Sequence, residues 1–208
     1  MSCRLCQSPV ADFASSRRKR YQQCSVCLSV MMHPLDLPDA ESEKALYLTH
    51  QNDVNDLRYQ AYLSPAINAV LRDYDNTAAG LDFGAGPGPV VQHVLSGHGF
   101  QLSLYDPIFH PDVSVLDRDY DFIICTEVME HFHDPNQAFK QLRKLLKPCG
   151  KLYCMTSLFD PNIDFMKWHY KNDPTHVFFY HQNALDYIAE QHGFSAVTVD
   201  ERLICFSG

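Results

Sequence analysis

From residue 77 onward, short apolar segments alternate with amphipathic ones, and this alternation limits the fold more than any other feature of the sequence. The segment 121–125 contains an uninterrupted apolar run, Phe122-Ile123-Ile124, which is typical of a strand buried on both faces. The same patterning predicts further strands over 79–83, 100–105, 151–156, 196–199 and 202–206, and helices over 90–95, 135–146 and 183–192. Alternating strands and helices predict an α/β fold with a doubly wound, mostly parallel sheet.

Four cysteines near the N-terminus follow a different pattern. Cys3, Cys6, Cys24 and Cys27 form two C-x2-C pairs separated by seventeen residues, which is metal-ligand spacing. Zinc is the favoured ion because it tolerates four thiolates and needs no redox partner, while an iron site of the rubredoxin kind has similar spacing and stays open. Four thiolates complete the coordination shell, so the predicted role of the metal is structural.

Charge and composition divide the chain into three predicted parts. Residues 1–36 hold five Lys or Arg against two Asp, a net charge of +3, although the whole chain carries −8. We predict a four-cysteine zinc-binding module over 1–36, a helical lid or linker over 37–76 and the main domain over 77–208. Within the linker, one helix is expected from Asp39, and a second one is expected to begin at Ser64-Pro65 with Ser64 as its cap.

The net charge and the lack of long apolar segments argue against nucleic acid and membranes as partners. A charge of −8 argues against a general electrostatic grip on nucleic acid or on an anionic membrane. No apolar run approaches the roughly 20 residues needed to cross a bilayer, and the N-terminal residues lack the pattern of a signal peptide. A cytoplasmic protein is the expectation. The basic run 17–20 is either a solvated loop or a contact for an acidic partner.

A glycine-rich turn follows the first predicted strand of the main domain. The run Leu81-Asp82-Phe83-Gly84-Ala85-Gly86-Pro87-Gly88 lacks the Lys-Ser/Thr pair of triphosphate sites, and its spacing differs from the dinucleotide pattern. Asp82 would repel a pyrophosphate but could accept a hydrogen bond from an ammonium group. Asp106 ends the next strand, where a carboxylate suits the two hydroxyls of a ribose; a solvated turn aspartate is the alternative. These residues predict a site for a positively charged, phosphate-free nucleoside.

With these residues, the sequence resembles the class I S-adenosylmethionine-dependent methyltransferases. The resemblance runs from about Tyr59 to the C-terminus and rests on four ordered segments, 81–88, 105–107, 120–135 and 142–152. It implies a Rossmann-like sheet and S-adenosylmethionine as the cofactor. It also implies that the cofactor is bound by Asp82, Gly84, Ala85, Gly86, Gly88, Asp106, Pro107 and Glu127. An N-terminal zinc ribbon occurs in some members, including certain sugar C-methyltransferases.

One departure from the family pattern affects the sheet. Only fourteen residues separate Asp106 from Asp121, too few for the usual helix, third strand and helix. The segment 113–116 is the sole strand candidate there. We therefore predict a trimmed third-strand edge on the adenine side, with Val115 or Leu116 touching the base.

Candidate catalytic residues follow the strand over 121–125. Glu127, Glu130 and His131 would share one face if this stretch were helical, and they resemble the Glu-x-x-Glu-His motif of two metal-dependent groups, the ubiquinone-pathway O-methyltransferases and the small-RNA 3′-end 2′-O-methyltransferases. They could hold Mg²⁺, His131 could serve as a base or substrate contact, or the residues could be structural. His176, in an aromatic segment beyond the next strand, is the second candidate for a base or a metal ligand. Tyr47, His50 and Tyr59 are candidates for a lid.

The expected function is methyl transfer to a small-molecule or carrier-bound acceptor, at oxygen, carbon or nitrogen. Two alternatives stay open. One is a metal-assisted RNA 2′-O-methyltransferase, and the other is a non-catalytic zinc-ribbon adaptor with a vestigial cofactor fold. The sequence does not define the oligomeric state.

Overall fold

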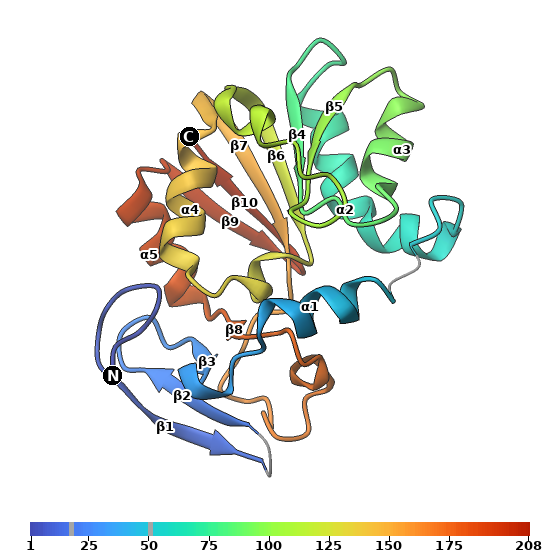
Figure 1. Ribbon diagram of the computed structural model, residues 1–208. Helices are drawn as coiled ribbons and strands as arrows, with labels where there is room; N and C mark the ends of the chain where they lie inside the picture. The colour runs from blue at the N-terminus through green and yellow to red at the C-terminus, as the bar shows by residue number, and fades with distance from the viewer. Residues whose placement is uncertain (17–18, 50–51) are drawn as a thin grey trace.

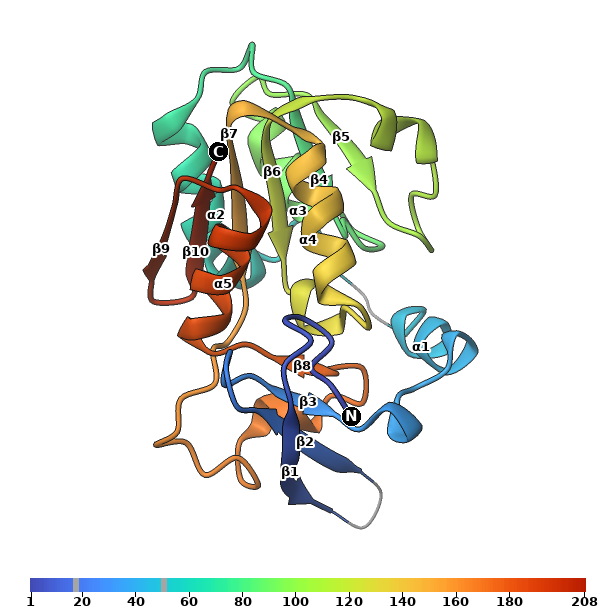
Figure 2. The ribbon, with the colours of Figure 1, turned by 90° about the vertical axis from the view of Figure 1, so that its left-hand side faces the viewer.

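The structure is a computed structural model and describes residues 1–16, 19–49 and 52–208. It contains a large sheet covered by helices and a small sheet at the N-terminal end of the molecule, with α1 (Ala40–Tyr47) between them at one side (Figures 1 and 2). In spatial order, the large sheet consists of β5 (Leu102–Tyr105), β4 (Gly80–Phe83), β6 (Tyr120–Thr126), β7 (Leu146–Met155), β10 (Leu203–Ser207) and β9 (Ala196–Asp200).

The large sheet is doubly wound and mostly parallel, as the sequence predicted. Strands β5, β4, β6 and β7 pair in parallel, and β10 pairs antiparallel with both β7 and β9, so β10 alone runs against the other five. Helices α2 (Leu57–Asp73) and α3 (Val90–Ser96) cover one face, and α4 (Pro135–Lys144) and α5 (Gln182–His192) cover the other (Figure 1).

Burial of both faces explains the uninterrupted apolar run of β6. Phe122 and Ile124 pack into the core beneath α2 and α3, whereas Ile123 and Cys125 pack into the core on the side of α4 and α5. All four side chains are fully buried. Successive side chains of a strand point to opposite faces, so a strand with helices on both sides needs apolar residues at every position.

The trimmed edge of the sheet is also confirmed. Between β5 and β6 the described chain forms only the short 3₁₀ helix η2 (Val113–Asp117), and β5 is the edge strand. Val115 is buried there, and its carbonyl accepts a hydrogen bond of 2.7 Å from the Tyr120 hydroxyl. The segment that was the sole strand candidate therefore closes the edge as a turn of helix.

The small sheet combines the cysteine-bearing segment with residues from late in the chain. Its strands are β1 (Val10–Ser15), β2 (Arg20–Cys24), β3 (Val30–Met32) and β8 (Phe178–Phe179), all paired antiparallel, with η1 (Pro34–Asp36) after β3. Its aromatic core includes Tyr21, Phe165 and Phe179, whose rings lie 4.9 to 6.1 Å apart, centroid to centroid. Because β8 is the fourth strand, the N-terminal sheet is completed by the segment that follows β7 and η4 (His169–Asn172).

The start of α2 differs from the sequence prediction. Helix α2 runs without a break from Leu57, capped by Asp56, so the prediction that a helix begins at Ser64-Pro65 was wrong. Pro65 has no N–H to donate to the Ala61 carbonyl, but the Ser64 hydroxyl donates to that carbonyl over 2.8 Å. The residue expected to cap a new helix instead satisfies the acceptor that proline leaves open.

Asp73, at the end of α2, joins that helix to the sheet and provides a test of the packing. Its carboxylate accepts hydrogen bonds from Arg72, Lys151 and Tyr153 over 2.7 to 2.8 Å. Burial by itself raises the pKa of Asp73, but the three donors outweigh it and hold that pKa below its usual value.

We expect Asp73→Asn to lower the free energy of unfolding by about 1–3 kcal/mol at pH 7, measured by urea denaturation. A carboxyl whose pKa is depressed in the folded state stabilises above its unfolded pKa, so the gap between wild type and variant should narrow as the pH falls below about 4. Asp164→Asn is the control, because Asp164 forms an exposed ion pair with Lys167. Equal losses in the two variants would contradict this role of Asp73.

Candidate active site and cysteine cluster

The glycine-rich turn after β4 is packed tightly between two other segments. Gly84 has a φ of +84°, and a Cβ atom built on it would lie 2.3 Å from Val128 Cγ2. A Cβ on Gly88 would lie 1.9 Å from the Asn52 carbonyl oxygen, in the segment that precedes α2. Only glycine fits at both positions. Because these residues carry no side chain, the backbone of the turn itself lines the cavity beside it.

Two carboxylates flank this turn. Asp106 accepts hydrogen bonds from the backbone N–H groups of Gly86, Ile108 and Phe109 over 2.8 to 3.1 Å, so it joins the turn to the loop after β5. Asp82 is 3% exposed, and burial together with the nearby charge of Asp106 raises the pKa of Asp82 to about 7. A ligand cation at this point would supply the positive charge that favours ionised Asp82.

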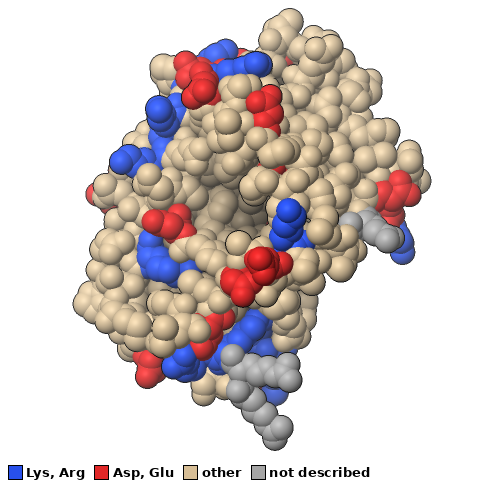
Figure 3. Space-filling view, viewed as in Figure 1, with Lys and Arg blue, Asp and Glu red and all other residues tan. Residues whose placement is uncertain are grey.

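A cavity of about 840 Å³ opens at the carboxyl ends of β4, β5 and β6. Figure 3 shows the hollow near the centre of the molecule. The predicted site residues that line this cavity are Asp82, Gly84, Ala85, Gly86, Gly88, Asp106, Pro107, Glu127, His131 and His176. Glu130 is fully buried and does not line it. The lining does not include Val115 or Leu116, so the expectation that one of them contacts a base is not met. After β5, the cavity is bordered instead by Ile108 and Phe109.

The stretch after β6 is not one continuous helix. Glu127 has a φ of +55°, and only the short 3₁₀ helix η3 (Met129–His131) follows, so the expected common helical face of Glu127, Glu130 and His131 was wrong. Glu127 instead accepts a hydrogen bond of 2.7 Å from Arg202. Glu130 accepts one of 2.5 Å from the Tyr170 hydroxyl, while its other carboxylate oxygen, Oε2, is buried and has no hydrogen-bond partner among the described residues. Burial raises the pKa of both carboxyls.

His131 and His176 lie side by side, with ring centroids 4.8 Å apart. Nδ1 of His131 is 2.9 Å from the Thr175 carbonyl oxygen, and Nδ1 of His176 is 2.7 Å from the Tyr170 carbonyl oxygen. A carbonyl only accepts, so both Nδ1 atoms carry the proton. Burial lowers the pKa of His131 and lowers that of His176 to about 4. Both rings are therefore neutral at pH 7, and each has an unprotonated Nε2.

Residues before the large sheet cover one side of the cavity. Tyr47 lies edge-on to His131 with ring centroids 5.6 Å apart, and both Tyr47 and Tyr59 line the cavity. Glu43 of α1 accepts a hydrogen bond of 2.8 Å from His133. His50, the third lid candidate, lies outside the described residues. Of the basic run, Arg17 and Arg18 also lie outside them, and Arg20 forms an ion pair of 2.6 Å with Asp36.

Sequence reasoning missed the side chains that hold the two glutamates. Arg202 comes from the turn between β9 and β10, and its guanidinium lies 4.5 Å from the centroid of the Tyr62 ring. Tyr170 comes from η4 and also bonds Thr156. Tyr170 belongs to the aromatic segment singled out from sequence, but no local pattern could have placed Arg202 next to Glu127.

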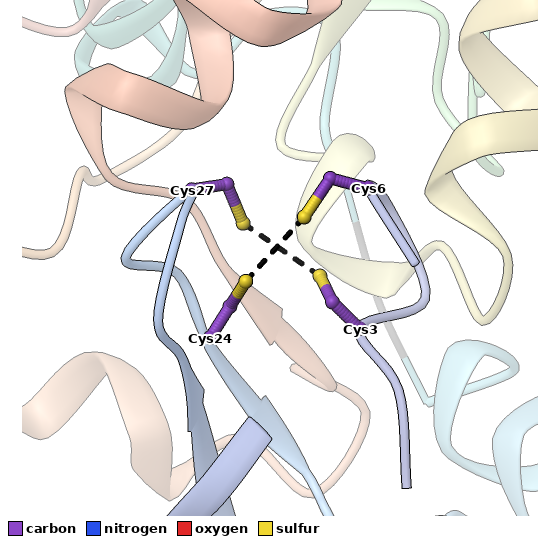
Figure 4. A group of neighbouring side chains, drawn as sticks. All are labelled: Cys3, Cys6, Cys24 and Cys27. Carbon is purple, nitrogen blue, oxygen red and sulfur yellow. Dashed lines mark hydrogen bonds between the residues drawn. The ribbon is translucent and has the colours of Figure 1, made fainter. Parts of the chain in front are cut away.

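The four N-terminal cysteines converge, as Figure 4 shows. The sulfurs of Cys3 and Cys27 lie 3.6 Å apart and those of Cys6 and Cys24 lie 3.4 Å apart. All four sulfurs lie within 4.8 Å of one another, and none forms a disulfide. Zn–S bonds of about 2.3 Å in a tetrahedron give S–S distances of about 3.8 Å, so the donor set fits a tetrahedral ion.

Comparison with known proteins identifies the family. Residues 54–199 match the family model described as a methyltransferase domain, so the chain belongs to that family. The ubiquinone biosynthesis O-methyltransferase of Klebsiella pneumoniae is 31% identical over 81 residues, 38% of this chain and 33% of that protein. The protein of the same name from Coxiella burnetii is 35% identical over 66 residues, 30% of this chain and 28% of that protein. The match thus spans about a third of these relatives or less.

A solved structure shares the fold over almost the whole chain. The 1,6-didemethyltoxoflavin-N1-methyltransferase of Burkholderia thailandensis, solved with 1,6-didemethyltoxoflavin and S-adenosylhomocysteine, superimposes with a TM-score of 0.56 at 14% identity and covers 94% of this chain and 97% of that one. At the level of family and fold, the resemblance to S-adenosylmethionine-dependent methyltransferases is confirmed. None of the helices in the described ranges is long and apolar enough to cross a bilayer.

Gly84→Ala tests the packing of the glycine-rich turn. We expect it to lower the free energy of unfolding by about 3 kcal/mol or more, because the new Cβ adds a clash with Val128 to the cost of a positive φ. The matched control is Gly193→Ala, since Gly193 has a φ of +73° but no atom of the described residues lies within 4 Å of a Cβ built there. That variant should lose only about 1 kcal/mol. Chemical denaturation measures the free energy of unfolding of both variants. Similar losses in the two variants would mean that the contact with Val128 does not add to the destabilisation.

Proposed function

We propose that this protein transfers a methyl group from S-adenosylmethionine to a hydroxyl group of a small-molecule acceptor. The observation that carries the proposal is one cavity lined both by the glycine-rich turn with Asp82 and Asp106 and by two neutral histidines. The choice of oxygen over carbon or nitrogen is supported by the relatives named for O-methylation.

The residues around the glycine-rich turn fit the cofactor. Asp106 uses one lone pair of Oδ2 on Gly86 and two of Oδ1 on Ile108 and Phe109, so Oδ2 keeps a lone pair for a ribose hydroxyl. Asp82 faces a cavity whose described lining contains no Lys or Arg. The ammonium group of the methionine moiety would complement that buried carboxylate.

S-adenosylmethionine, when bound, supplies an electrophilic methyl group, and the protein must align the acceptor with it. In that transfer the acceptor oxygen would take the methyl group from the sulfonium sulfur, and Nε2 of His131 would accept the hydroxyl proton. The Nδ1–H of His131 stays bonded to the Thr175 carbonyl, and the nearby carboxylates of Asp173 and Glu43 stabilise the imidazolium. His176 offers a second unprotonated Nε2 beside it.

The cavity favours a small neutral acceptor over a polyanion. Glu43, Glu127 and Asp173 line it in addition to Asp82 and Asp106, and no cationic side chain of the described chain does so. Together with the net charge of −8, this disfavours an RNA substrate or a phosphate-bearing carrier arm.

Calorimetry with S-adenosylhomocysteine tests the proposal directly. We expect wild type to bind it and Asp106→Ala to lose at least about tenfold in affinity, because one hydrogen bond to a charged group is removed and the turn loses its anchor at Gly86. Asp112→Ala is the matched control: Asp112 also accepts a backbone N–H two residues on, from Ser114, but outside the cavity. Absence of binding to folded wild type would refute the proposal and favour the non-catalytic adaptor.

We also propose that Cys3, Cys6, Cys24 and Cys27 hold one structural zinc ion. Elemental analysis should find about one zinc per chain in wild type, and none at this site in Cys24→Ser, which should also lose near-UV circular dichroism from the small sheet. Cys149→Ser is the control because Cys149 is exposed and lies outside the cluster. If the analysis finds one iron per chain, with a thiolate charge-transfer spectrum, the bound ion is iron and not zinc.

A second candidate is a metal-assisted form of the same reaction, with a divalent ion on Glu130, His131 and His176. It is favoured by the unpartnered Oε2 of Glu130, and by ligand atoms of the three residues that lie within 4.8 Å of one another. Two imidazoles suit a transition ion better than the Mg²⁺ expected from sequence. Such an ion would lower the pKa of the acceptor hydroxyl when bound.

Metal titration distinguishes the two forms. If the ion is present, Co²⁺ added to the zinc-loaded protein should bind at one further site with a visible absorption band, and His176→Ala should reduce its affinity at least about tenfold. His98→Ala is the control, since His98 lies outside both the cavity and this cluster. If Co²⁺ binds at no site other than the zinc site, the metal-assisted form is excluded and His131 acts directly as the base.

A further inference from the structure

Arg4 lies inside the first C-x2-C pair, and its guanidinium bonds backbone carbonyls outside the cysteine cluster. Its Nη1 donates to the His133 carbonyl over 2.9 Å, and its Nη2 donates to the Val177 carbonyl over 2.7 Å and more weakly to that of Met32 over 3.4 Å. The guanidinium also lies 5.8 Å from the centroid of the Phe178 ring. One side chain from the cysteine module therefore bonds three separate segments of backbone.

Two of those segments carry the histidines of the cavity. His133 follows His131 by two residues, and Val177 follows His176 directly. The same segments are also joined to each other, because the Val177 N–H donates to the Glu130 carbonyl over 2.9 Å and the Tyr180 hydroxyl donates to the Met129 carbonyl over 2.9 Å. Arg4 thus closes a ring of hydrogen bonds around η3 and β8.

We propose that Arg4 is a positioning residue, through which the cysteine cluster fixes the two segments that present His131 and His176 to the cavity. The inference rests on the proposed function, because it concerns the groups that would accept the proton or hold the ion. Each histidine depends on a backbone carbonyl for its tautomer, and those carbonyls, of Thr175 and Tyr170, belong to the segment that Arg4 holds at Val177.

A planar guanidinium suits this role better than an ammonium group. It donates in fixed directions from separate nitrogens, so it can bond two carbonyls at once while its face lies over an aromatic ring. Its Nε is buried with no partner in the ranges that the structure describes, and burial lowers the pKa of Arg4. The protein keeps a partly desolvated cation here for the bonds that its two terminal nitrogens make.

The chain contains a matched control in Arg143. This arginine also donates to two backbone carbonyls, those of Gly193 and Leu146, and lies 5.6 Å from the centroid of the Phe194 ring. It joins the end of α4 to the end of α5 and bonds neither histidine segment. Arg143→Met removes two longer bonds, of 3.2 and 3.3 Å, elsewhere in the protein, so it reports the purely structural effect of losing such an arginine.

Nitrogen NMR of histidine-labelled protein, loaded with zinc, tests the proposal. Signals of the two rings are assigned with His131→Gln and His176→Gln. In wild type, both rings should show a single tautomer with the proton on Nδ1. Arg4→Met should give averaged nitrogen shifts for at least one of them, and Arg4→Lys, which keeps the charge but not the fork, should lie between. Arg143→Met should keep the wild-type pattern even if it unfolds more easily.

Amide hydrogen exchange provides the second measurement. Protection of the Val177 amide should fall at least about fivefold in Arg4→Met relative to Arg143→Met at equal global stability, since two bonds to a charged group are lost. Affinity for S-adenosylhomocysteine should stay within about twofold of wild type, because Arg4 does not line the cavity.

Unchanged tautomers and unchanged Val177 protection in folded Arg4→Met would overturn the proposal. If Arg4→Met does not fold, Arg4→Lys decides in the same way; if neither folds, Arg4 supports the whole chain and the specific role is overturned. Failure of wild type to bind S-adenosylhomocysteine would refute the proposed function alone, because the NMR and exchange measurements need no cofactor.

Discussion

The burial of β6 on both faces is the constraint on which the rest of this structure depends. Phe122 and Ile124 need α2 and α3 on one side, and Ile123 and Cys125 need α4 and α5 on the other. With helices on both faces, the carboxyl ends of the parallel strands are left as the edge at which loops can enclose a cavity. The glycine-rich turn, Asp106 and Glu127 all follow strands at that edge.

Most charged side chains at this edge are carboxylates. Their burial is unfavourable, and the protein compensates for it in different ways. Glu127 is paired with Arg202, and Asp106 accepts three backbone N–H groups. Within the described part of the chain, Asp82 and the Oε2 atom of Glu130 have no such compensation, and burial raises the pKa of both carboxyls. Of these two acids only Asp82 lines the cavity, and a cavity with an uncompensated buried acid is suited to a cationic ligand such as a sulfonium nucleoside.

The small N-terminal sheet is part of the same construction. Its fourth strand, β8, comes from the C-terminal half, and the Val177 N–H bonds the Glu130 carbonyl in η3. A segment of about 35 residues buries too little apolar surface to fold alone, and the aromatic core that it shares with Phe165 and Phe179 adds buried apolar surface. The cysteine module and the acceptor side of the cavity are therefore neighbours in space, although some 100 residues or more separate them in the chain.

The sequence alone determined the features that depend on local pattern. Apolar periodicity gave the doubly wound sheet, the short connection after Asp106 gave its trimmed edge, and cysteine spacing gave the cluster. It failed at Ser64-Pro65, because a side-chain hydroxyl can satisfy the carbonyl that proline leaves open. Only the tertiary structure decided which partners meet: that Arg202 holds Glu127, that Tyr170 holds Glu130, and that Arg4 reaches His133 and Val177. Such contacts join residues far apart in the chain, and a single sequence carries no local signal for them because they are set by how the two sheets pack together.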